Sequence, residues 1–286
     1  MLNKKTIFCA IISNEEKNLN KFFDLIHNLS SIFEENYIII IESDSNDKTL
    51  DIISKKMKNE KGEWHSLGNL KKKYKKRSKR LEICRNKYLD IINNKKKFKE
   101  FDYMLVLDGD KVNELLGYNV LKNSLLDLKD EEWSCLFPNQ LYFYYDIWAL
   151  RIQQLYETDC FKEFKDLLRN NSYKKSYYLS ITKKMFFLRN RKDRYIKVTS
   201  AFGGMGIYKI KNILDIYYDS KDGKECEHVY FHQKIYNKYN NLFIDKKLIN
   251  SKGINSHVLY SIAYSFSNFF AERFYKKIFN KDLINI

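Results

Sequence analysis

Alternating strand-length and helix-length apolar patterns in the N-terminal part of the chain constrain its fold more than any other feature. Residues 6–12 are β-branched and apolar and end at Ser13-Asn14, which is typical of a buried strand. Apolar residues then recur at helical spacing from residue 15 to about residue 33. A second apolar run at 37–41 precedes a second helical segment that begins at Lys48. This order predicts the opening of a parallel α/β sheet with right-handed crossovers.

Patterning is weaker in the rest of the chain but still indicates further elements. Residues 159–194 are basic and poorly patterned, so we expect an excursion or mobile loop there. Further strands are predicted over residues 103–107, 134–137, 201–210 and 242–250, and further helices over 81–92 and 258–279. There are no internal repeats and no linkers rich in Gly, Ser or Pro, so a single domain with a C-terminal helical tail is expected.

Composition excludes several classes of protein. A chain of 286 residues with 44% hydrophobic content can bury a sizeable core and is not intrinsically disordered. No run approaches the ~18–20 apolar residues that span a bilayer, and the basic N-terminus lacks the apolar run of a signal peptide. The five cysteines are odd in number, scattered and without a CxxC pair, which favours free thiols in the cytoplasm.

The formal net charge of +16 permits nucleic acid, phosphorylated substrates or an acidic membrane face as partners. Lys, Asn, Ile and Tyr are frequent throughout, as an AT-rich genome would produce, so charge alone is weak evidence of function. Residues 71–80 are a solvated face, an element that attracts anionic lipid or a phosphorylated acceptor, or a nucleic-acid contact. A nucleic-acid-binding protein stays the rival class, although no recognised binding module is present.

The most informative motif is Val-Leu-Asp-Gly-Asp at residues 106–110. Asp108 and Asp110 lie at the carboxyl end of a predicted buried strand, where α/β sheets bind ligands. Two carboxylates at this spacing can hold a divalent cation that binds a diphosphate, and Gly109 lets the backbone approach the ligand. Asp-Gly-Asp is also an ordinary turn, so the motif is weak by itself.

The order of the other motifs gives this one more weight. Residues 11–16 (IISNEE), 42–49 (ESDSNDKT) and Arg85-Asn86 precede Asp108-Gly109-Asp110. This succession resembles the family-2-type glycosyltransferases with a GT-A fold, a Rossmann-like mixed sheet flanked by helices. Residues 145–151, 200–208 and 226–229 are similar to capsule-associated mannosyltransferases and to glycosyltransferases of large DNA viruses. The resemblance covers about residues 6–260.

The resemblance implies a donor site for a UDP- or GDP-linked sugar, with Mn²⁺ or Mg²⁺, in residues 1–112. Ser13, Asn14 and Glu15 would border the nucleotide, and Asp44 would reach its base or ribose. Arg80 or Arg85 would contact the diphosphate or stabilise the donor pocket. Asp108 would contact the ribose or the sugar, and Asp110 would bind the metal. A cation and an Arg fit this chemistry because negative charge builds on the leaving diphosphate.

Residues 113–258 would bind the acceptor, a hydroxyl of a glycan or glycolipid. Glu227, at a predicted helix start, would deprotonate it for an inverting transfer, although a retaining outcome would give this residue another role. His228 and His257 are rival second metal ligands. Facing the acceptor we expect Asp146, Trp148, Arg151, Gly203 and Gly204. Core packing is the alternative for Trp148, and a bulge is the alternative for the glycines.

The sequence therefore predicts a metal-dependent glycosyltransferase of the hexosyltransferase type, over residues 1–258. A nucleotidyltransferase is the alternative enzyme, but the first strand is followed by Ser13-Asn14-Glu15 rather than by a glycine-rich phosphate loop. The aromatic tail, 259–286, packs in the core or attaches the protein peripherally to the inner face of a membrane that carries a lipid-linked acceptor. The oligomeric state is left open.

Overall fold

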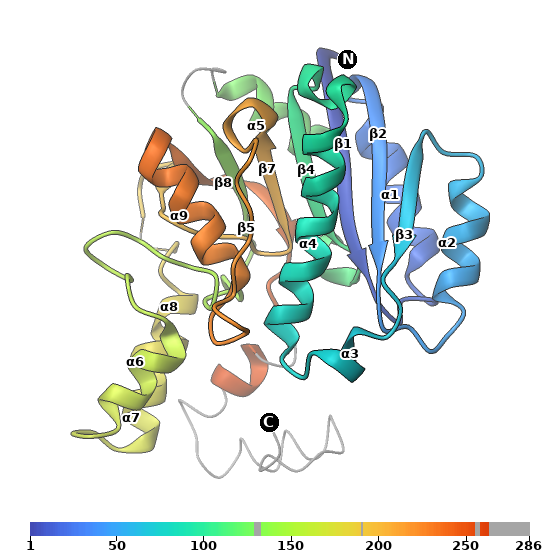
Figure 1. The fold of residues 1–286 in the computed structure, drawn as a ribbon. Helices are drawn as coiled ribbons and strands as arrows, with labels where there is room; N and C mark the ends of the chain where they lie inside the picture. The colour runs from blue at the N-terminus through green and yellow to red at the C-terminus, as the bar shows by residue number, and fades with distance from the viewer. Residues whose placement is uncertain (129–132, 190, 255–257, 263–286) are drawn as a thin grey trace.

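An eight-stranded mixed sheet runs through the part of the chain that the computed structural model describes, which is residues 1–128, 133–189, 191–254 and 258–262 (Figure 1). The strand order is β3-β2-β1-β4-β7-β5-β8-β6. The strands are β1 Leu2–Ile12, β2 Phe33–Glu42, β3 Gly62–Ser66, β4 Tyr103–Asp108, β5 Cys135–Gln140, β6 Tyr195–Lys197, β7 Met205–Lys209 and β8 Leu242–Ser251. Strands β3, β2, β1 and β4 are mutually parallel, as predicted, whereas β7 is antiparallel to β4 and β5, and β6 is antiparallel to β8.

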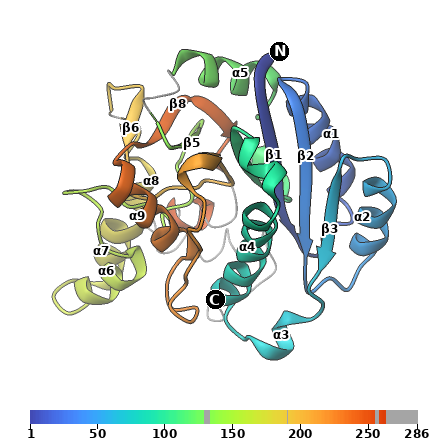
Figure 2. The same cartoon turned by 45° about the horizontal axis from the view of Figure 1, so that its top comes forward.

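Helices cover both faces of this sheet (Figures 1 and 2). Ile7 and Cys9 of β1 point to one face and share a core with α4 and α9, whereas Phe8 and Ala10 share the other core with α1, α2 and α5. The bounds of these helices are α1 Leu19–Ser30, α2 Thr49–Met57, α4 Arg77–Asn94, α5 Tyr118–Asp127 and α9 Glu227–Tyr239. Burial of the sheet on both faces explains why its central strands are continuous apolar runs, and the predicted fold class is confirmed.

The chain order creates a switch point between β1 and β4. From β1 the chain moves outward to β2 and β3 and then returns to the opposite side of β1 as β4. The register aligns Ile11 with Asp108 and Ile12 with Glu42, so these strands end at the same edge. Ligands of open α/β sheets bind at such a point, outside the carboxyl ends of the strands.

Residues 159–194, for which an excursion or mobile loop was expected, form an excursion that is largely helical (Figure 1). This segment forms α6 Cys160–Leu167, α7 Tyr173–Tyr177, a π-helical turn at Tyr178–Thr182 and α8 Lys183–Met185. The sequence does contain an N-cap residue for each of the first two helices. The side chains of Asp159 and Ser172 accept hydrogen bonds from backbone N–H groups in the first turns of α6 and α7. Helices this short contain too few turns for an apolar period to emerge.

Several other elements differ from the predictions. Strand β7 begins at Met205 rather than at residue 201, because Gly203 and Gly204 adopt positive φ values of 68° and 88°. Strand β3 was not predicted. Helix α4 begins at Arg77 rather than at residue 81, so the basic segment is divided between it and the short helix α3 Leu70–Lys73.

The predicted C-terminal helix lies largely outside the described residues. Residues 258–262 are helical, as expected, and the prediction for 263–286 concerns residues outside the described ranges. Within the part of the chain that is described, no helix has both the length and the apolar character needed to cross a membrane.

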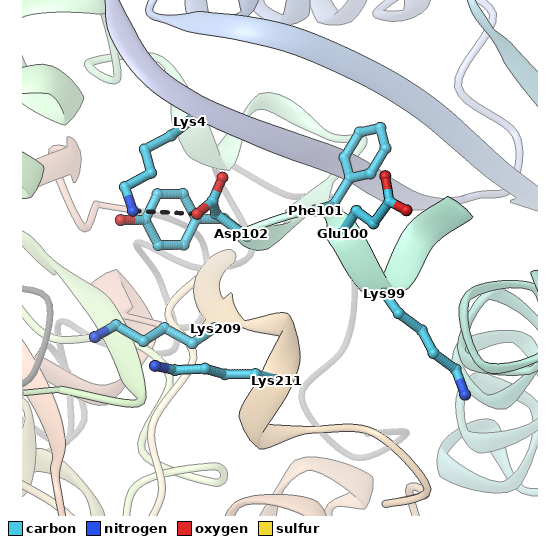
Figure 3. Close-up of a pocket in the computed structure, with 8 residues that line it drawn as sticks. Lys4, Lys99, Glu100, Phe101, Asp102, Lys209 and Lys211 are labelled. Atoms are coloured by element: carbon cyan, nitrogen blue, oxygen red, sulfur yellow. Dashed lines mark hydrogen bonds and ion pairs between the residues drawn. The ribbon is translucent and has the colours of Figure 1, made fainter. Parts of the chain in front are cut away.

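A pocket of about 230 Å³ lies at the amino end of β4 (Figure 3). Its lining includes Lys99, Lys211 and Asp102, and the Lys4 ammonium pairs with the Asp102 carboxylate at 3.1 Å. Because Asp108 ends the same strand at its opposite end, this pocket is separate from the edge where the predicted site residues gather.

Candidate active site

The two carboxylates of the Asp-Gly-Asp motif lie at the switch point. Asp108 is the last residue of β4, and its backbone N–H donates to the Gly204 carbonyl at 2.9 Å. Asp110 is exposed and accepts a bond from the Val112 N–H at 3.0 Å, which caps the short 3₁₀ helix Lys111–Asn113. Hydrogen bonds to the backbone therefore hold both residues in place at the carboxyl edge of the sheet.

The surroundings of Asp108 oppose its ionisation. Loss of hydration raises the pKa of this carboxyl to about 7, with the Asp110 and Asp146 charges adding to the rise and the Arg85 charge working against it. The side chain is nevertheless 35% exposed. Asp110 also adds to the raised pKa of Glu15, where loss of hydration is the largest cause. The site thus concentrates negative charge that a bound cation would relieve.

A buried ion pair joins α4 to α9 behind Asp108. The Arg85 guanidinium Nε lies 3.0 Å from Glu227 Oε1, and both side chains are under 5% exposed. The second arm of Arg85 lies 3.7 Å from Asp108. The guanidinium also stands over the Phe202 ring at 4.9 Å and near the Tyr218 ring at 5.7 Å. These contacts hold the positive charge of Arg85 inside the protein, between Glu227 and Asp108.

Asp146 and the Gly203–Gly204 pair complete the far side of the site. Asp146 Oδ2 accepts a bond from the Gly203 N–H at 3.0 Å. A side chain at Gly204 would meet Val112 at 2.4 Å, and its φ of 88° disfavours any residue other than glycine. Burial raises the pKa of the Asp146 carboxyl, with the Glu227 charge adding to the rise. Asp146 is half-buried, so it is more accessible than Glu227.

Hydrogen bonds join the loop that follows β1 to the loop that follows β2. Asn14 has a φ of 56°, and its side-chain oxygen accepts from the Asn46 N–H at 2.8 Å. The Glu15 N–H donates to the Thr49 hydroxyl at 2.8 Å. Asn14 and Glu15, and with them the preceding Ser13, are therefore held beside the β2–α2 loop.

Both carboxylate oxygens of Asp44 contact other groups of the protein. It is 7% exposed, Oδ1 accepts from the Lys71 N–H at 2.8 Å, and Oδ2 lies 3.4 Å from the Arg80 guanidinium. Arg80 also donates to the carbonyls of Tyr74 and Lys75. Asp44 and Arg80 together fasten the basic segment to the end of β2.

Arg77 is an exposed basic residue at the first position of α4 that the sequence analysis did not single out. Its charge lowers the pKa of Asp108. Of the two arginines proposed from the sequence, Arg85 is buried and Arg80 is bound to Asp44. Helix α4 starts four residues earlier than predicted, and the charged run obscured this start.

The histidines of α9 lie in an aromatic core. His228 stacks on the Phe202 ring at 3.9 Å, is 3% exposed and has no hydrogen bond at either ring nitrogen. Burial lowers its pKa well below the ordinary value. His232 stacks on His228 and bonds Ser200 and Tyr208, each at 3.0 Å. His257 lies outside the described residues.

Two residues expected on the acceptor side make mainly structural contacts. Arg151 is 3% exposed, pairs with Asp159 at 3.2 Å and donates to the carbonyls of Trp148 and Leu150. Trp148 is half-buried, and its ring meets that of Phe161 edge-on at 6.2 Å. Their contacts secure the segment that follows Asp146.

The donor groups suit a cation that also binds phosphate oxygens. No three His, Cys, Asp or Glu side chains within the described ranges converge on a metal position. Mg²⁺ characteristically takes only one or two protein carboxylates and completes its shell with phosphates and water. Exposed Asp110, beside an Asp108 whose ionisation is hindered by loss of hydration and by neighbouring carboxylates, fits that kind of site.

Comparison with known proteins identifies the fold. No family model matches the chain, and no curated protein matches it by sequence. The mannosyltransferase PcManGT from Pyrobaculum calidifontis, solved with GDP-Man and Mn²⁺, has a TM-score of 0.52 and 9% identity over 93% of this chain and 64% of that one. TarS 1-349 from S. aureus, with UDP-GlcNAc, gives 0.49 and 14% over 91% and 66%. Glucosyl-3-phosphoglycerate synthase from Mycobacterium tuberculosis, with UDP, gives 0.44 and 9% over 92% and 79%.

The first of these matches supports the predicted architecture. The similarity to PcManGT extends over nearly the whole chain, and the sheet has the mixed order described above. The chain therefore has the GT-A fold that its sequence predicted. It spans slightly less than two thirds of the length of PcManGT and of TarS 1-349.

Proposed function

We propose that this protein is a metal-dependent glycosyltransferase, which moves a sugar from a UDP- or GDP-linked donor to a hydroxyl of a glycan or glycolipid. The observation that carries the proposal is the position of Asp108 and Asp110 at the switch point of a GT-A sheet. The similarly folded PcManGT was solved with a nucleotide-sugar and Mn²⁺, which supports a donor of this class.

The donor would lie along the carboxyl edge, between the loops that follow β1 and β2 and the Asp-Gly-Asp motif. Ser13, Asn14 and Glu15 would border the nucleotide, with Asp44 behind them. Asp110 would hold Mn²⁺ or Mg²⁺, which when bound supplies positive charge against the leaving diphosphate. Exposed Arg77 would add a second positive charge there, because buried Arg85 is occupied by Glu227 and Asp108.

Two carboxylates could take the proton of the acceptor hydroxyl, and their contacts differ. Glu227, the base suggested by sequence, is 2% exposed and bound to Arg85 at 3.0 Å. Asp146 is more accessible, and burial raises the pKa of its carboxyl, which makes the carboxylate more basic than an ordinary one. We therefore assign the base to Asp146 and the holding of Arg85 to Glu227. Direct in-line attack would then invert the configuration of the sugar.

A thermal-shift panel of UDP, GDP, CMP and ADP, each with Mn²⁺ and with EDTA, tests the donor class. One uridine or guanosine nucleotide should stabilise the protein in a metal-dependent way. At ~100 times its dissociation constant the gain is about 2.7 kcal/mol, which is easily visible as a shift of the melting temperature. No shift with any nucleotide, together with salt-sensitive binding to DNA or RNA, would favour the nucleic-acid-binding class instead.

Replacing Asp146 by Asn tests the base. The amide oxygen can still accept from the Gly203 N–H, so the fold and the nucleotide-dependent thermal shift should persist. Transfer should fall by about 10²–10⁴-fold in kcat, because only proton removal is lost. Unchanged turnover in Asp146→Asn would refute this assignment and return Glu227 to the role.

A further inference from the structure

Exposed apolar side chains gather at one end of the molecule. Seven of the ten large hydrophobic residues that are exposed in the described chain lie in three segments, which are residues 141–142 directly after β5, residues 160–178, and residue 254 just after β8. These seven are Leu141, Tyr142, Phe161, Leu168, Tyr173, Tyr178 and Ile254. Leu141 and Tyr142 follow β5 and donate their N–H groups to the carbonyls of Ser251 and Lys252, which fixes them beside the end of β8.

Four of the seven lie within residues 160–178, which comprise α6, α7 and the residues directly after each, and which we call the α6–α7 hairpin; it projects from the body in both views (Figures 1 and 2). A core of Ile147, Ile181 and Met185 fastens the hairpin to the segment that follows β5. Phe161 is 50% exposed and Leu168 is 37% exposed. Their spacing of seven residues places them on one face of α6, close to exposed Lys165. This face therefore mixes apolar and cationic side chains.

Uncompensated positive charge borders the same end. Residues 71–77 contain six basic residues and no acidic one, and none of the six has an ion pair among the described residues. The segment is fixed at the end of β2 through Asp44, which accepts a bond from the Lys71 N–H. Both views place α3 and the α6–α7 hairpin at this end of the molecule (Figures 1 and 2). The hairpin itself, residues 160–178, carries five basic and two acidic residues.

From this arrangement we infer that the end of the molecule formed by residues 71–77, Leu141-Tyr142 and residues 160–178 docks on an anionic lipid bilayer. Cations would attract the negatively charged headgroups, and Phe161 and Leu168 would enter the boundary between headgroups and acyl chains. The docking does not depend on the proposed function. If that function holds, docking turns the site toward the membrane, so a lipid-linked glycan would be the acceptor.

A water-soluble polyanion fits this surface less well. It would contact the lysines but would gain nothing from apolar side chains left exposed among them, whereas burial of those side chains in a bilayer is favourable. The basic segment itself contains no exposed large hydrophobic residue, so the two parts supply complementary attractions. Membrane binding should consequently depend on both.

Co-sedimentation of the full chain with vesicles tests the inference. Binding to phosphatidylcholine mixed with phosphatidylglycerol should exceed binding to phosphatidylcholine alone and should weaken as salt is added. Lys72→Gln with Lys75→Gln should lower the partition coefficient about fivefold for each charge removed. Phe161→Ser with Leu168→Ser should lower it by about tenfold at constant charge.

Matched variants at the opposite end of the molecule distinguish docking by this surface from nonspecific binding to vesicles. Lys55→Gln with Lys58→Gln removes the same charge near the end of α2, and Leu126→Ser removes an exposed apolar side chain from α5. Both should bind vesicles as the wild type does. Equal losses in these controls, or no binding to anionic vesicles, would overturn the inference. So would binding to heparin or single-stranded DNA with no effect of Phe161→Ser and Leu168→Ser on vesicle binding. None of these variants touches the metal or donor residues, so failure here leaves nucleotide binding intact.

Discussion

Replacing Asp110 by Asn is expected to lower the rate at which the sugar donor is cleaved to nucleoside diphosphate by about 10³-fold or more. Asp110 is exposed at the switch point, where its carboxylate would hold the divalent cation. An amide carries no charge and is a much poorer ligand for Mg²⁺ or Mn²⁺. Because Asn can still cap the 3₁₀ helix through the Val112 N–H, folding should be unaffected. Product release is measured with the donor selected by the thermal-shift panel.

Asp24→Asn is the matched control, since it removes the same charge from an exposed position on α1. It should retain full turnover and the full metal-dependent shift. In Asp110→Asn the shift by nucleotide with Mn²⁺ should fall to the value measured in EDTA. A variant that keeps wild-type turnover and its Mn²⁺ dependence would show that Asp110 does not hold the metal.

Replacing Glu227 by Leu is expected to lower the free energy of unfolding by about 3–5 kcal/mol. The Arg85 guanidinium is buried, and Glu227 is its nearest carboxylate at 3.0 Å, whereas Asp108 lies at 3.7 Å. Removing Glu227 would leave a buried positive charge without its main partner, and recovering the loss would require bringing Arg85 into water. Guanidinium unfolding followed by circular dichroism measures the change.

The double variant Arg85→Met, Glu227→Leu distinguishes the ion pair from simple packing. Removing both charges should cost less than removing Glu227 alone, because no buried charge is then left unpaired. Asp166→Asn, which breaks the exposed Asp166–Arg169 pair at 3.6 Å, should leave stability unchanged. If Glu227→Leu unfolds at the wild-type denaturant concentration, Glu227 is not the group that stabilises Arg85.

Local sequence patterns were sufficient to predict the long strands at the centre of the sheet. The runs over residues 6–12, 37–41 and 103–107 became β1, β2 and β4, because strands buried on both faces must be continuously apolar. Helices α6 and α7 escaped detection because they are too short for a period. Their stability depends on packing against Ile147 and its neighbours, which are near in space only after folding.

The order of the motifs predicted a site at the carboxyl ends of the central strands, but it could not predict which side chains there are buried or paired. Burial and pairing are properties of the assembled chain. Arg85 is adjacent to Glu227 only because α4 and α9 pack on the same face of the sheet, 142 residues apart in sequence. The exposure of Arg77 and the partial burial of Asp146 are likewise properties of the folded chain.

The sequence by itself determined the α/β alternation, the Asp-Gly-Asp motif at the end of a central strand and the excess of positive charge, because each is a local pattern or a count. Only the tertiary structure decided which carboxylates are accessible, which arginines are already paired and which end of the molecule carries both the exposed apolar side chains and the basic segment. Those properties depend on contacts between distant residues, and such contacts exist only once the sheet has formed.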